Sequence, residues 1–436
     1  MKQVNVGILG CGTVGTGVAK ILMDNKDIIS SRVGAVINLK YVADIDTETD
    51  RGITFDDGVF ISDANKVIDD PEVHIIIEMI GGESIAKEFI LKAINNGKHI
   101  VTANKALLAG SGNQLLSAAS EKGCDIFFEA SVGGGMPVIK TLRESLACNK
   151  IQAVTGILNG TCNYILSKIT TDGNSFEDAL AKAQAKGFAE ADPTLDVEGF
   201  DTAHKLSILS ALAYGMEINF KDIYVEGITK IAPMDFEFAR QFGYSIKLLA
   251  ISKDNGNGIE ARVHPTMIPH GNILSNVTGS LNAVTVTGDG VGDIFISGHG
   301  AGMMPTASAV VGDVVDIARN ILSGTTGRVP LFSYQKENIK KVPVLSINEI
   351  STNYYLRFSA LDQPGVLSKI SGLLGDNGIS IKSVHQKDRK TMGSVPIIML
   401  THSAKEADMK AALSDITSLD VVSEDPVIIR IEDEEE

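Results

Sequence analysis

The sequence has few aromatic residues, no tryptophan and only four cysteines among its 436 residues. The cysteines, Cys11, Cys124, Cys148 and Cys162, show no CxxC spacing and no regular framework. This excludes a small disulfide-stapled fold and favours a reducing compartment. We therefore expect a cytoplasmic protein. No cluster of His and Cys is present either, so we predict no transition-metal site.

Positive charge and long apolar runs are also scarce. The 39 Lys and Arg residues are outnumbered by 54 Asp and Glu residues, which gives a formal net charge of −15. Nucleic-acid phosphates and anionic lipid headgroups would be repelled, so we expect neither nucleic acid nor a membrane surface as a partner. No apolar run reaches the roughly 18 residues that a membrane helix needs. The opening VNVGILG is too short for the apolar core of a signal peptide.

Aliphatic residues and glycine, in contrast, are abundant. Hydrophobic residues make up 44% of the sequence, and a chain of this length should form two or three domains with substantial cores. The 43 glycines indicate many tight turns. The first glycine cluster lies in VNVGILGCGTVGTGVAKIL, directly after an apolar, β-branched run and before a stretch with helical spacing.

This cluster, Gly10-x-Gly12-x-x-Gly15, matches the dinucleotide-binding fingerprint of a Rossmann domain. Gly10 permits the tight turn, Gly12 lets the backbone approach a pyrophosphate, and Gly15 lets the helix pack on the strand. The helix N-terminus offers free N–H groups and a positive dipole end to the phosphates. A purely structural glycine turn is the alternative, but the strand–turn–helix context favours the nucleotide site.

The second predicted strand, INLKYVAD, ends at Asp44, which can bind the ribose hydroxyls of a dinucleotide. Asp44 follows the glycines at more than the usual ~20 residues, so we predict an inserted loop at about residues 24–34. Asp46, Glu48 and Asp50 would repel a 2′-phosphate, and Arg51 is the nearby cation. We therefore predict NAD in preference to NADP. The alternative is that these acids form a solvated turn.

Further apolar strands are predicted at residues 73–81, 99–104 and 125–131, alternating with helical stretches as in a doubly wound parallel sheet. Ligands bind such sheets at the carboxyl edge of the strands. Lys105 falls at this edge, where a lysine can meet the nicotinamide, the substrate, or both.

An acidic segment, KGFAEADPTLDVEGFDTAHKL, occupies residues 186–206. Its second half reads as a loop entering a helix, which places Asp201 and Lys205 four residues apart on one face. The carboxylate can orient the ammonium and raise its pKa, while burial lowers that pKa. Hydride transfer to an aldehyde needs a proton for the developing alkoxide, and an ammonium can stabilise and protonate it. From the spacing alone, an ordinary surface salt bridge is an equal alternative.

Taken together, the motifs of this chain resemble those of the homoserine dehydrogenase family. The motifs that carry the resemblance are Gly10-Cys11-Gly12-Thr13-Val14-Gly15, VTANKALLA, FEASVGGGMPVI, GILNGTCNYIL and the acidic segment, in that order. The resemblance covers essentially the whole chain, and we expect the monofunctional form because the sequence shows no aspartate-kinase-like stretch before the first strand. It implies NAD(P)-dependent, reversible interconversion of L-homoserine and L-aspartate 4-semialdehyde, a step towards threonine, methionine and isoleucine.

The resemblance also implies roles for individual residues. Lys205 matches the proton donor, Glu190 the ligand of the substrate amino group, and Asp201 a further residue of the substrate site. Gly187 would lie near substrate and nicotinamide, and Asp196 matches another acidic position. Asp192 and Glu198 are expected to be turn or surface residues. The implied cofactor-binding set is Gly10, Cys11, Gly12, Thr13, Val14, Gly15, Asp44, Lys105, Gly187, Glu190 and Gly302.

A monovalent cation, usually sodium, is a further implication of the resemblance. The carbonyls that would bind it belong to Glu129, Val132, Gly134 and Met136, in FEASVGGGMPVI. A glycine run after a strand bends the backbone and turns carbonyls inward, and oxygen-only ligands suit a hard cation. The same oxygens would also hold a water. The expected task of the ion is structural, at the junction of the nucleotide and catalytic domains.

A second glycine cluster, at residues 297–322, predicts a loop opening a helix that returns to the first domain. By the resemblance, Gly302 contacts the nucleotide. The predicted domains are a Rossmann domain at 1–135, completed by about 303–325, and an α/β catalytic and dimerisation domain at 136–302. A linker at 327–350 and a C-terminal module at 351–432 follow. Because the family is usually dimeric or tetrameric, we expect a homodimer or homotetramer.

The C-terminal module has the predicted order βαββαβ and resembles an ACT domain, a small ferredoxin-like regulatory unit. Its recurring features are Asp362-x-Pro364-Gly365 after the first strand and Asn377-Gly378 after the first helix. Such modules usually pair edge to edge and bind an amino acid, for which threonine is the main candidate. The alternative is a module that only supports dimerisation. We expect chemistry not to require it, and the final EDEEE to be solvent-facing charge.

Two other functions compete with the dehydrogenase reading. A non-catalytic amino-acid sensor would keep a nucleotide as a structural element, but it would not need the set Lys105, Glu190, Asp201 and Lys205. A related dehydrogenase would act on a different amino-acid semialdehyde. Activity with aspartate 4-semialdehyde against other aldehydes distinguishes all three.

Overall fold

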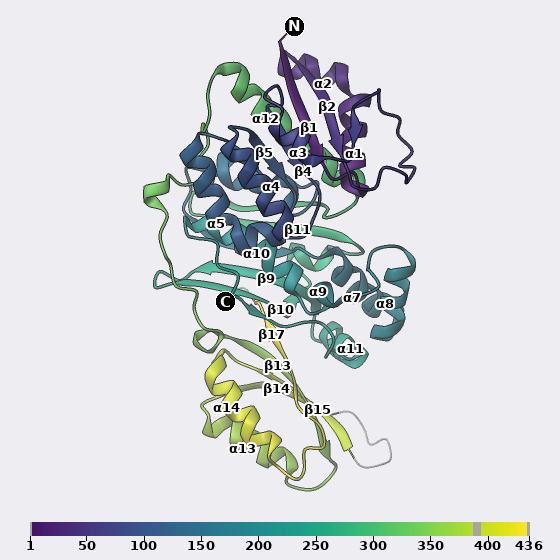
Figure 1. The fold of residues 1–436 in the computed structure, drawn as a ribbon. Coiled ribbons are helices and arrows are strands. Elements are labelled where there is room, and N and C mark those ends of the chain that lie inside the picture. Colours follow the sequence, from purple (N-terminus) through teal and green to yellow (C-terminus); the bar gives the residue numbers. More distant parts are fainter. Residues whose placement is uncertain (1, 387–393, 434–436) are drawn as a thin grey trace. The chain divides into compact units, whose positions relative to one another are not determined.

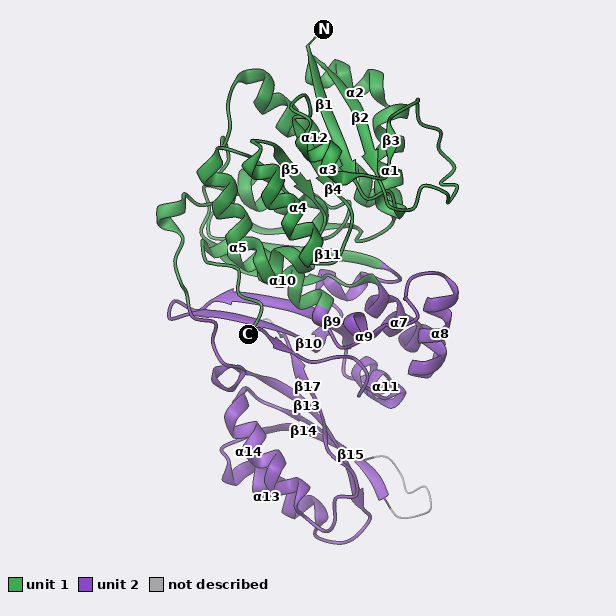
Figure 2. Cartoon of the chain, in the orientation of Figure 1, with its two compact units in different colours: residues 1–160, 201–221, 281–342 green, residues 161–200, 222–280, 343–436 purple. Residues whose placement is uncertain are grey.

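The computed structural model describes residues 2–386 and 394–433 (Figure 1). It divides into two compact units, which we describe separately (Figure 2). Unit 1 contains residues 1–160, 201–221 and 281–342, and unit 2 contains residues 161–200, 222–280 and 343–436. Among the described residues, no helix has both the length and the apolar character needed to cross a membrane.

The first part of unit 1 is built on a sheet of six parallel strands in the order β3-β2-β1-β4-β5-β6. The strands are β1 (Gln3–Leu9), β2 (Val36–Ala43), β3 (Phe60–Ile61), β4 (Ile75–Glu78), β5 (His99–Thr102) and β6 (Ile126–Phe127). The helices between them are α1 (Thr13–Asp24), α2 (Lys26–Val33), α3 (Ala64–Asp69), α4 (Ser84–Asn95) and α5 (Lys105–Lys122). Parallel strands with crossover helices confirm the predicted doubly wound architecture.

Helix α12 (Met303–Ser323) packs against α1 although it lies almost 300 residues later in the chain (Figure 1). Its apolar face, including Ala307, Val310 and Val314, belongs to the same buried core as Val6 and Val18 of the first strand and helix. The two helices approach so closely that a Cβ on Gly17 would lie 2.9 Å from Met303 Cγ. The predicted return of this helix to the nucleotide-binding region is therefore confirmed.

Two sequence expectations for unit 1 were wrong in detail. Residues 26–33 form helix α2 and not a loop, and Gly34 ends it in a left-handed conformation. The strand predicted at 125–131 stops at Phe127, and Glu129–Ser131 form a 3₁₀ turn. The reason is that the backbone N–H of Glu129 donates to the buried Asp313 on α12, 2.8 Å away, and so leaves the sheet.

The remaining part of unit 1 combines three antiparallel strands with the helix that carries Asp201 and Lys205. Strands β7 (Ile151–Ile157), β11 (Leu281–Gly288) and β12 (Gly292–His299) pair in the order β12-β11-β7. The other elements are α6 (Val138–Lys140), a π-helical turn at Thr141–Ser145, α10 (Phe200–Tyr214) and a 3₁₀ turn at Lys336–Asn338. Nearly every residue of α10 is buried, which suits a helix that positions chemistry inside the protein.

Unit 2 is built on a long antiparallel pair, β9 (Tyr244–Asp254) and β10 (Ile259–Pro269). The other elements before the C-terminal module are α7 (Gly160–Asp172), α8 (Phe176–Ala185), α9 (Thr194–Val197), β8 (Tyr224–Val225), α11 (Pro233–Gln241) and a 3₁₀ turn at Ile273–Asn276. A further 3₁₀ turn, Ile347–Glu349, leads into the C-terminal strands.

The C-terminal module has the predicted βαββαβ order with one short additional strand, β16, before its second helix. Its elements are β13 (Ser351–Leu361), α13 (Val366–Asp376), β14 (Ile381–Gln386), β15 (Ser394–Thr401), the short β16 (Ala404–Lys405), α14 (Glu406–Thr417) and β17 (Val427–Ile431). The strands pair in the order β17-β13-β15-β14. Both helices pack on them around a core that includes Tyr354, Phe358, Ile370, Met399 and Met409.

This module shares its sheet with the rest of unit 2. Strand β17 pairs in parallel with β10, at Thr266↔Arg430 and Met267↔Ile431. Together with the short β8, which pairs with β10 at Arg262 and Val263, strand β17 therefore covers this edge of β10. The prediction that the final EDEEE is solvent-facing charge is also wrong for its first two residues, Glu432 and Asp433. Glu432 binds Lys253 at 2.6 Å, and Tyr244 donates to Asp433 at 2.7 Å. The rest of EDEEE lies outside the described residues.

Candidate active site

The glycine-rich turn after β1 has the geometry that a dinucleotide phosphate site requires. Gly10 adopts φ +94°, and a Cβ there would lie 2.6 Å from the backbone of Met79. A Cβ on Gly15 would lie 2.0 Å from the Gly10 carbonyl oxygen. Around Gly12, in contrast, no atom lies within 4 Å of the position of a Cβ. No side chain caps α1, and the N–H groups of a helix N-terminus are suited to binding a phosphate.

Asp44 and Arg51 both hold the glycine turn. Asp44 accepts hydrogen bonds from the Cys11 N–H at 2.5 Å and from the Asp46 N–H at 2.9 Å. Arg51 donates to the Cys11 carbonyl at 2.7 Å, and its Nη2 lies 3.6 Å from both Asp44 Oδ1 and Asp46 Oδ2. Sequence reasoning treated Arg51 only as a nearby cation. The structure makes it part of the turn, with its charge next to two carboxylates.

The contact predicted between Asp201 and Lys205 is present. Lys205 Nζ donates to Asp201 Oδ2 at 2.6 Å, and both side chains are about nine-tenths buried. Lys205 also donates to the Leu158 carbonyl at 2.6 Å, just beyond the end of β7. Two of the three ammonium hydrogens are thus directed at fixed oxygens, which leaves the third available. An ordinary exposed salt bridge, the alternative from spacing, does not fit this burial.

Two residues from other elements also contact Asp201. Asn159 Nδ2 donates to Asp201 Oδ2 at 2.9 Å, and Lys105 Nζ lies 3.2 Å from Asp201 Oδ1. Lys105 is the first residue of α5, whose N-cap is Asn104. The part played by Asn159 was missed from the sequence. The signal that could have found it is its position in NGT, directly after an apolar strand.

The electrostatics of this cluster favour a permanently charged Asp201. Burial by itself raises the pKa of Asp201, but Lys205, Lys105 and the Asn159 amide all favour the carboxylate. The net result is a pKa well below the ordinary value for aspartate. One negative charge therefore lies between two ammonium groups. Such a cluster can stabilise a developing alkoxide and supply a proton to it.

The other residues expected to bind substrate lie in unit 2. Gly187 lies just after α8 with φ +72°, and Glu190 is exposed in the same loop, where Gln184 donates to its carbonyl at 3.1 Å. Asp196 lies in α9. Asp192 accepts from both the N–H and the hydroxyl of Thr194, at 3.1 and 2.6 Å, so it is a turn residue as expected.

The loop predicted to hold a cation forms a series of tight turns. The Glu129 carbonyl accepts from the Val132 N–H at 3.4 Å, and the Met136 carbonyl accepts from the Val138 N–H at 2.9 Å. The Glu129 carboxylate receives the N–H groups of Ile139 and Lys140, each at 2.8 Å. Within the described residues, no cluster of three or more His, Cys, Asp or Glu side chains has a metal-binding arrangement. Any ion here would therefore depend on carbonyl oxygens.

Gly302 has φ +116° and precedes the first turn of α12, which no side chain caps.

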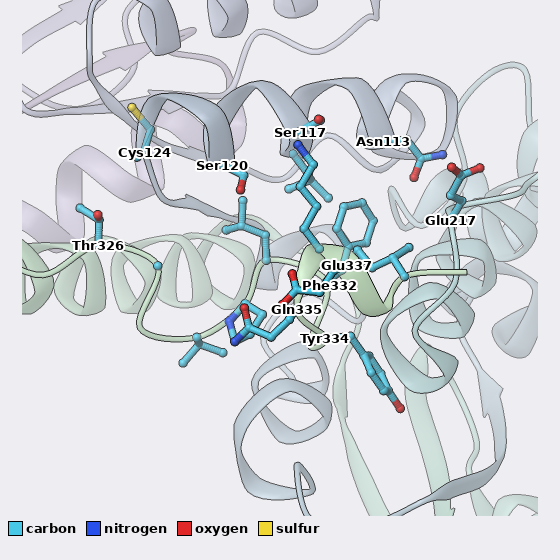
Figure 3. Close-up of a pocket in the computed structure, with 18 residues that line it drawn as sticks. Asn113, Ser117, Ser120, Cys124, Glu217, Thr326, Phe332, Tyr334, Gln335 and Glu337 are labelled. Carbon is cyan, nitrogen blue, oxygen red and sulfur yellow. The ribbon is translucent and has the colours of Figure 1, made fainter. Parts of the chain in front are cut away.

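A separate cavity of about 510 Å³ lies between α5 and the segment at residues 326–339 (Figure 3). Its polar lining includes Asn113, Ser117, Glu217 and Tyr334. None of the residues predicted for catalysis, substrate, cofactor or cation lines this cavity.

Comparison with known proteins defines the class and then the family. Three family models match the chain. The model described as "Homoserine dehydrogenase, NAD binding domain" matches residues 10–129, and the model described as "Homoserine dehydrogenase" matches residues 137–315. The model described as "ACT domain" matches residues 354–421. The chain is thus an NAD(P)-dependent oxidoreductase with a C-terminal ACT domain.

Full-length relatives agree with this class. A homoserine dehydrogenase of Neisseria gonorrhoeae is 46% identical over 432 residues, and one of Pseudomonas aeruginosa is 45% identical over 435 residues, each alignment covering 99% of both chains. The crystal structure of a homoserine dehydrogenase from Thiobacillus denitrificans has a TM-score of 0.94 at 44% identity, again over 99% of both chains. The chain belongs to the homoserine dehydrogenase family.

Proposed function

We propose that Lys205 is the proton-transferring residue in the interconversion of L-homoserine and L-aspartate 4-semialdehyde. The observation that carries this assignment is the buried ammonium of Lys205, fixed by Asp201 and the Leu158 carbonyl. The nicotinamide cofactor, when bound, supplies or accepts the hydride. The remaining N–H of Lys205 then donates to the aldehyde oxygen as negative charge develops, and the amine recovers the proton in the reverse direction.

Asp201 and Lys105 support this step without transferring the proton. Asp201 holds the ammonium in one orientation, and its low pKa keeps it charged across the working pH range. Lys105, with its side chain 40% exposed, is the more accessible of the two lysines. We assign it to the cofactor and to the electrostatic stabilisation of the substrate oxygen.

For the substrate we infer that Glu190 binds the ammonium of the amino acid, with Asp196 as a second acidic residue and the Gly187 backbone beside the nicotinamide. An exposed carboxylate in a loop is accessible to an incoming zwitterion, and Glu190 meets this condition. Gly302 and the turn from Gly10 to Gly15 are assigned to the cofactor. Their support is the positive φ of Gly302, the open space at Gly12 and the uncapped starts of α1 and α12.

We infer that NAD is preferred to NADP. The N–H groups of Arg51 donate to the carbonyls of Cys11, Thr49 and Asp46, and two carboxylates lie beside its guanidinium. A cation engaged in this way is poorly available to a 2′-phosphate, while Asp44 can accept ribose hydroxyls. The carboxylates around Asp44 would also repel the 2′-phosphate of NADP.

The remaining assignments concern organisation. We propose a nucleotide-binding domain at 1–135 completed by 303–325, a catalytic and dimerisation domain at 136–302, a linker at 327–350 and an ACT domain at 351–432. We further propose that the protein is a homodimer or homotetramer. A monovalent cation is bound by the carbonyls of Glu129, Val132, Gly134 and Met136. An amino acid regulates the enzyme, with threonine the main candidate. Four free thiols support a reducing, cytoplasmic location.

The test of the proposed function is the rate of NADH and NADPH oxidation with aspartate 4-semialdehyde and with a panel of other aldehydes. Strong preference for aspartate 4-semialdehyde supports the assignment. Equal rates with other semialdehydes would point to a related dehydrogenase, and no turnover of any aldehyde would point to a sensor.

A further inference from the structure

The last residue of β4, Glu78, is buried at the carboxyl edge of the parallel sheet, with 1% of its surface exposed. Its carboxylate accepts three hydrogen bonds. Oε1 accepts from the N–H groups of Ile80 and Gly81, at 2.9 and 3.2 Å, and Oε2 accepts from the Thr102 hydroxyl at 2.6 Å. Thr102 is the buried last residue of β5, the neighbouring strand. Glu78 therefore ties together the ends of two strands at the edge where such sheets bind ligands.

From Thr102 the hydrogen bonds continue to the residue before Lys105. The Thr102 hydroxyl accepts from the Asn104 N–H at 3.0 Å, and the Asn104 side-chain amide donates to the Gly82 carbonyl at 2.6 Å. A closed ring of hydrogen bonds thus connects Glu78, Thr102 and Asn104 through the loop that follows β4.

This ring fixes the start of α5, and with it the position of Lys105. Asn104 is the N-cap of that helix and accepts from the Leu107 N–H at 3.1 Å, and Lys105 is the first residue after the cap. The Lys105 ammonium lies 3.2 Å from Asp201 Oδ1. A misplacement of about 1 Å at a catalytic group can cost about a hundredfold in rate, so the backbone that carries this lysine has to be held firmly.

The loop that follows β4 also borders the glycine-rich turn after β1. A Cβ on Gly10 would lie 2.6 Å from the Met79 carbonyl, and the Met79 N–H donates to the Leu9 carbonyl at 2.7 Å. Glu78 is thus connected on one side to the glycine-rich turn and on the other to Lys105.

The three groups that bond to the Glu78 carboxylate are all donors, so the ring is complete only when Glu78 is ionised. Burial raises the pKa of Glu78, while the hydrogen bonds from Thr102, Gly81 and Ile80 oppose this rise. A glutamine would keep one acceptor oxygen for the two backbone N–H groups. Its NH₂ group, however, would face the Thr102 hydroxyl with a second donor, and the ring would open at that point.

We infer that Glu78 is a positioning residue for the reaction, which acts through Thr102 and Asn104 on the placement of Lys105. This inference rests on the role proposed above for Lys105 and adds the group that sets the position of that lysine. Because its side chain is buried, Glu78 is not itself open to substrate or cofactor. Its effect is on how precisely the Lys105 ammonium meets the cofactor and the substrate oxygen, and not on proton transfer itself.

The test measures initial rates of homoserine oxidation by the full-length enzyme, with the cofactor and homoserine varied in turn. The variants are Glu78→Gln, Thr102→Val and Lys105→Met, together with the double variant Glu78→Gln/Lys105→Met. Thr102→Ser keeps the hydroxyl and is the conservative control. Glu88→Gln, at an exposed position on α4, is the matched control for the change of charge. Thermal melting checks that each variant is folded.

We expect Glu78→Gln and Thr102→Val each to lower kcat/KM about tenfold, and Thr102→Ser and Glu88→Gln to stay within about twofold of wild type. In the Lys105→Met background, Glu78→Gln should lower kcat/KM by less than about twofold, because the residue through which it acts is already absent.

Equal losses from Glu78→Gln in the wild-type and Lys105→Met backgrounds would show a structural effect and overturn the inference. Rates near wild type in both Glu78→Gln and Thr102→Val would also overturn it. If Glu78→Gln does not fold, Thr102→Val takes its place in both backgrounds. An unchanged kcat/KM in Lys105→Met would contradict the role proposed for Lys105, and the inference would fall with it.

Discussion

Lys205 and Asp201 are one turn apart on α10, and the Lys205 ammonium donates to Asp201 at 2.6 Å inside the protein. The carboxylate also lies 3.2 Å from the Lys105 ammonium. Two cations therefore share one anion, and the cluster keeps an excess positive charge. In a buried site such a charge acts strongly on a nearby oxygen, because the effective dielectric constant is lower than in water.

Replacing Lys205 tests the proton-transfer assignment. We expect Lys205→Met, which keeps most of the side-chain volume, to lower kcat by about 10²–10⁴ because the alkoxide loses its proton donor. Cofactor affinity, measured by fluorescence titration, should stay within about twofold because the phosphate cradle is unaffected. Lys186→Met, an exposed lysine of the same acidic segment, is the control. Turnover close to wild type in Lys205→Met would contradict the assignment.

Asn159 is expected to act through Asp201. In Asn159→Ala the carboxylate loses a hydrogen bond that favours its charged form, so the pKa of Asp201 rises. Since the low pKa keeps Asp201 ionised, the acid limb of the kcat/KM profile should move to higher pH, with kcat lowered about tenfold.

The control for this prediction is Asn163→Ala. Asn163 donates to the Val277 carbonyl at 3.2 Å, so its loss should affect stability and leave the pH profile in place. An unshifted acid limb in Asn159→Ala would show that this amide is only structural.

Glu190 is expected to govern substrate binding. Glu190→Gln should raise KM for homoserine at least tenfold, because the substrate ammonium loses its counter-charge, while KM for the cofactor changes little. The matched change is Asp192→Asn, since Asp192 lies two residues away and is engaged by Thr194. If KM for homoserine is unchanged in Glu190→Gln, the counter-charge must come from another acid, such as Asp196 or Asp201.

Cofactor preference follows from the surroundings of Arg51. We expect a higher kcat/KM with NADH than with NADPH at one fixed ionic strength, because Asp44 and Asp46 neutralise the guanidinium. The double variant Asp46→Ala/Asp50→Ala should improve the relative efficiency with NADPH by releasing Arg51 and reducing repulsion. A wild-type preference for NADPH of tenfold or more would mean that Arg51 moves to the 2′-phosphate.

Loss of Glu432 should destabilise the β9–β10 part of unit 2 and not only the ACT domain. Glu432 Oε1 pairs with Arg262 of β10, which is 1% exposed, and Glu432 Oε2 binds Lys253. Burial raises the pKa of Glu432, but Arg262 and Lys253 more than offset this and lower it. The stabilisation is therefore complete above the pKa of the unfolded chain and is lost as the pH falls towards the folded value.

In urea unfolding at neutral pH, Glu432→Gln should lower the free energy of unfolding by about 1–3 kcal/mol. The difference from wild type should shrink in acid. Glu424→Gln, at an exposed position bonded only to Ser359 among the contacts described, should have little effect. Deletion of residues 343–436 should be more damaging than the sequence suggested, since it also removes β17 from the edge of β10. A truncated chain as stable and active as the full one would contradict this.

Local sequence determined much of the architecture. The glycine fingerprint between β1 and α1, the alternation of strands and helices, and the βαββαβ order of the ACT domain follow from short-range periodicity and turn residues. The pair Asp201 and Lys205 was also predictable, because four residues make about one helical turn and both side chains stay on one face.

Tertiary structure decided the rest, because it depends on contacts between residues far apart in the sequence. Asn159 and Lys105 reach Asp201 only through the ends of β7 and α5, which lie 42 and 96 residues away along the chain. Arg51 meets the glycine turn because β2 lies beside β1, and Glu432 meets Arg262 because β17 pairs with β10. Strand pairing over such distances is specified by the packing of the whole fold and leaves no periodic signal in a local stretch of sequence.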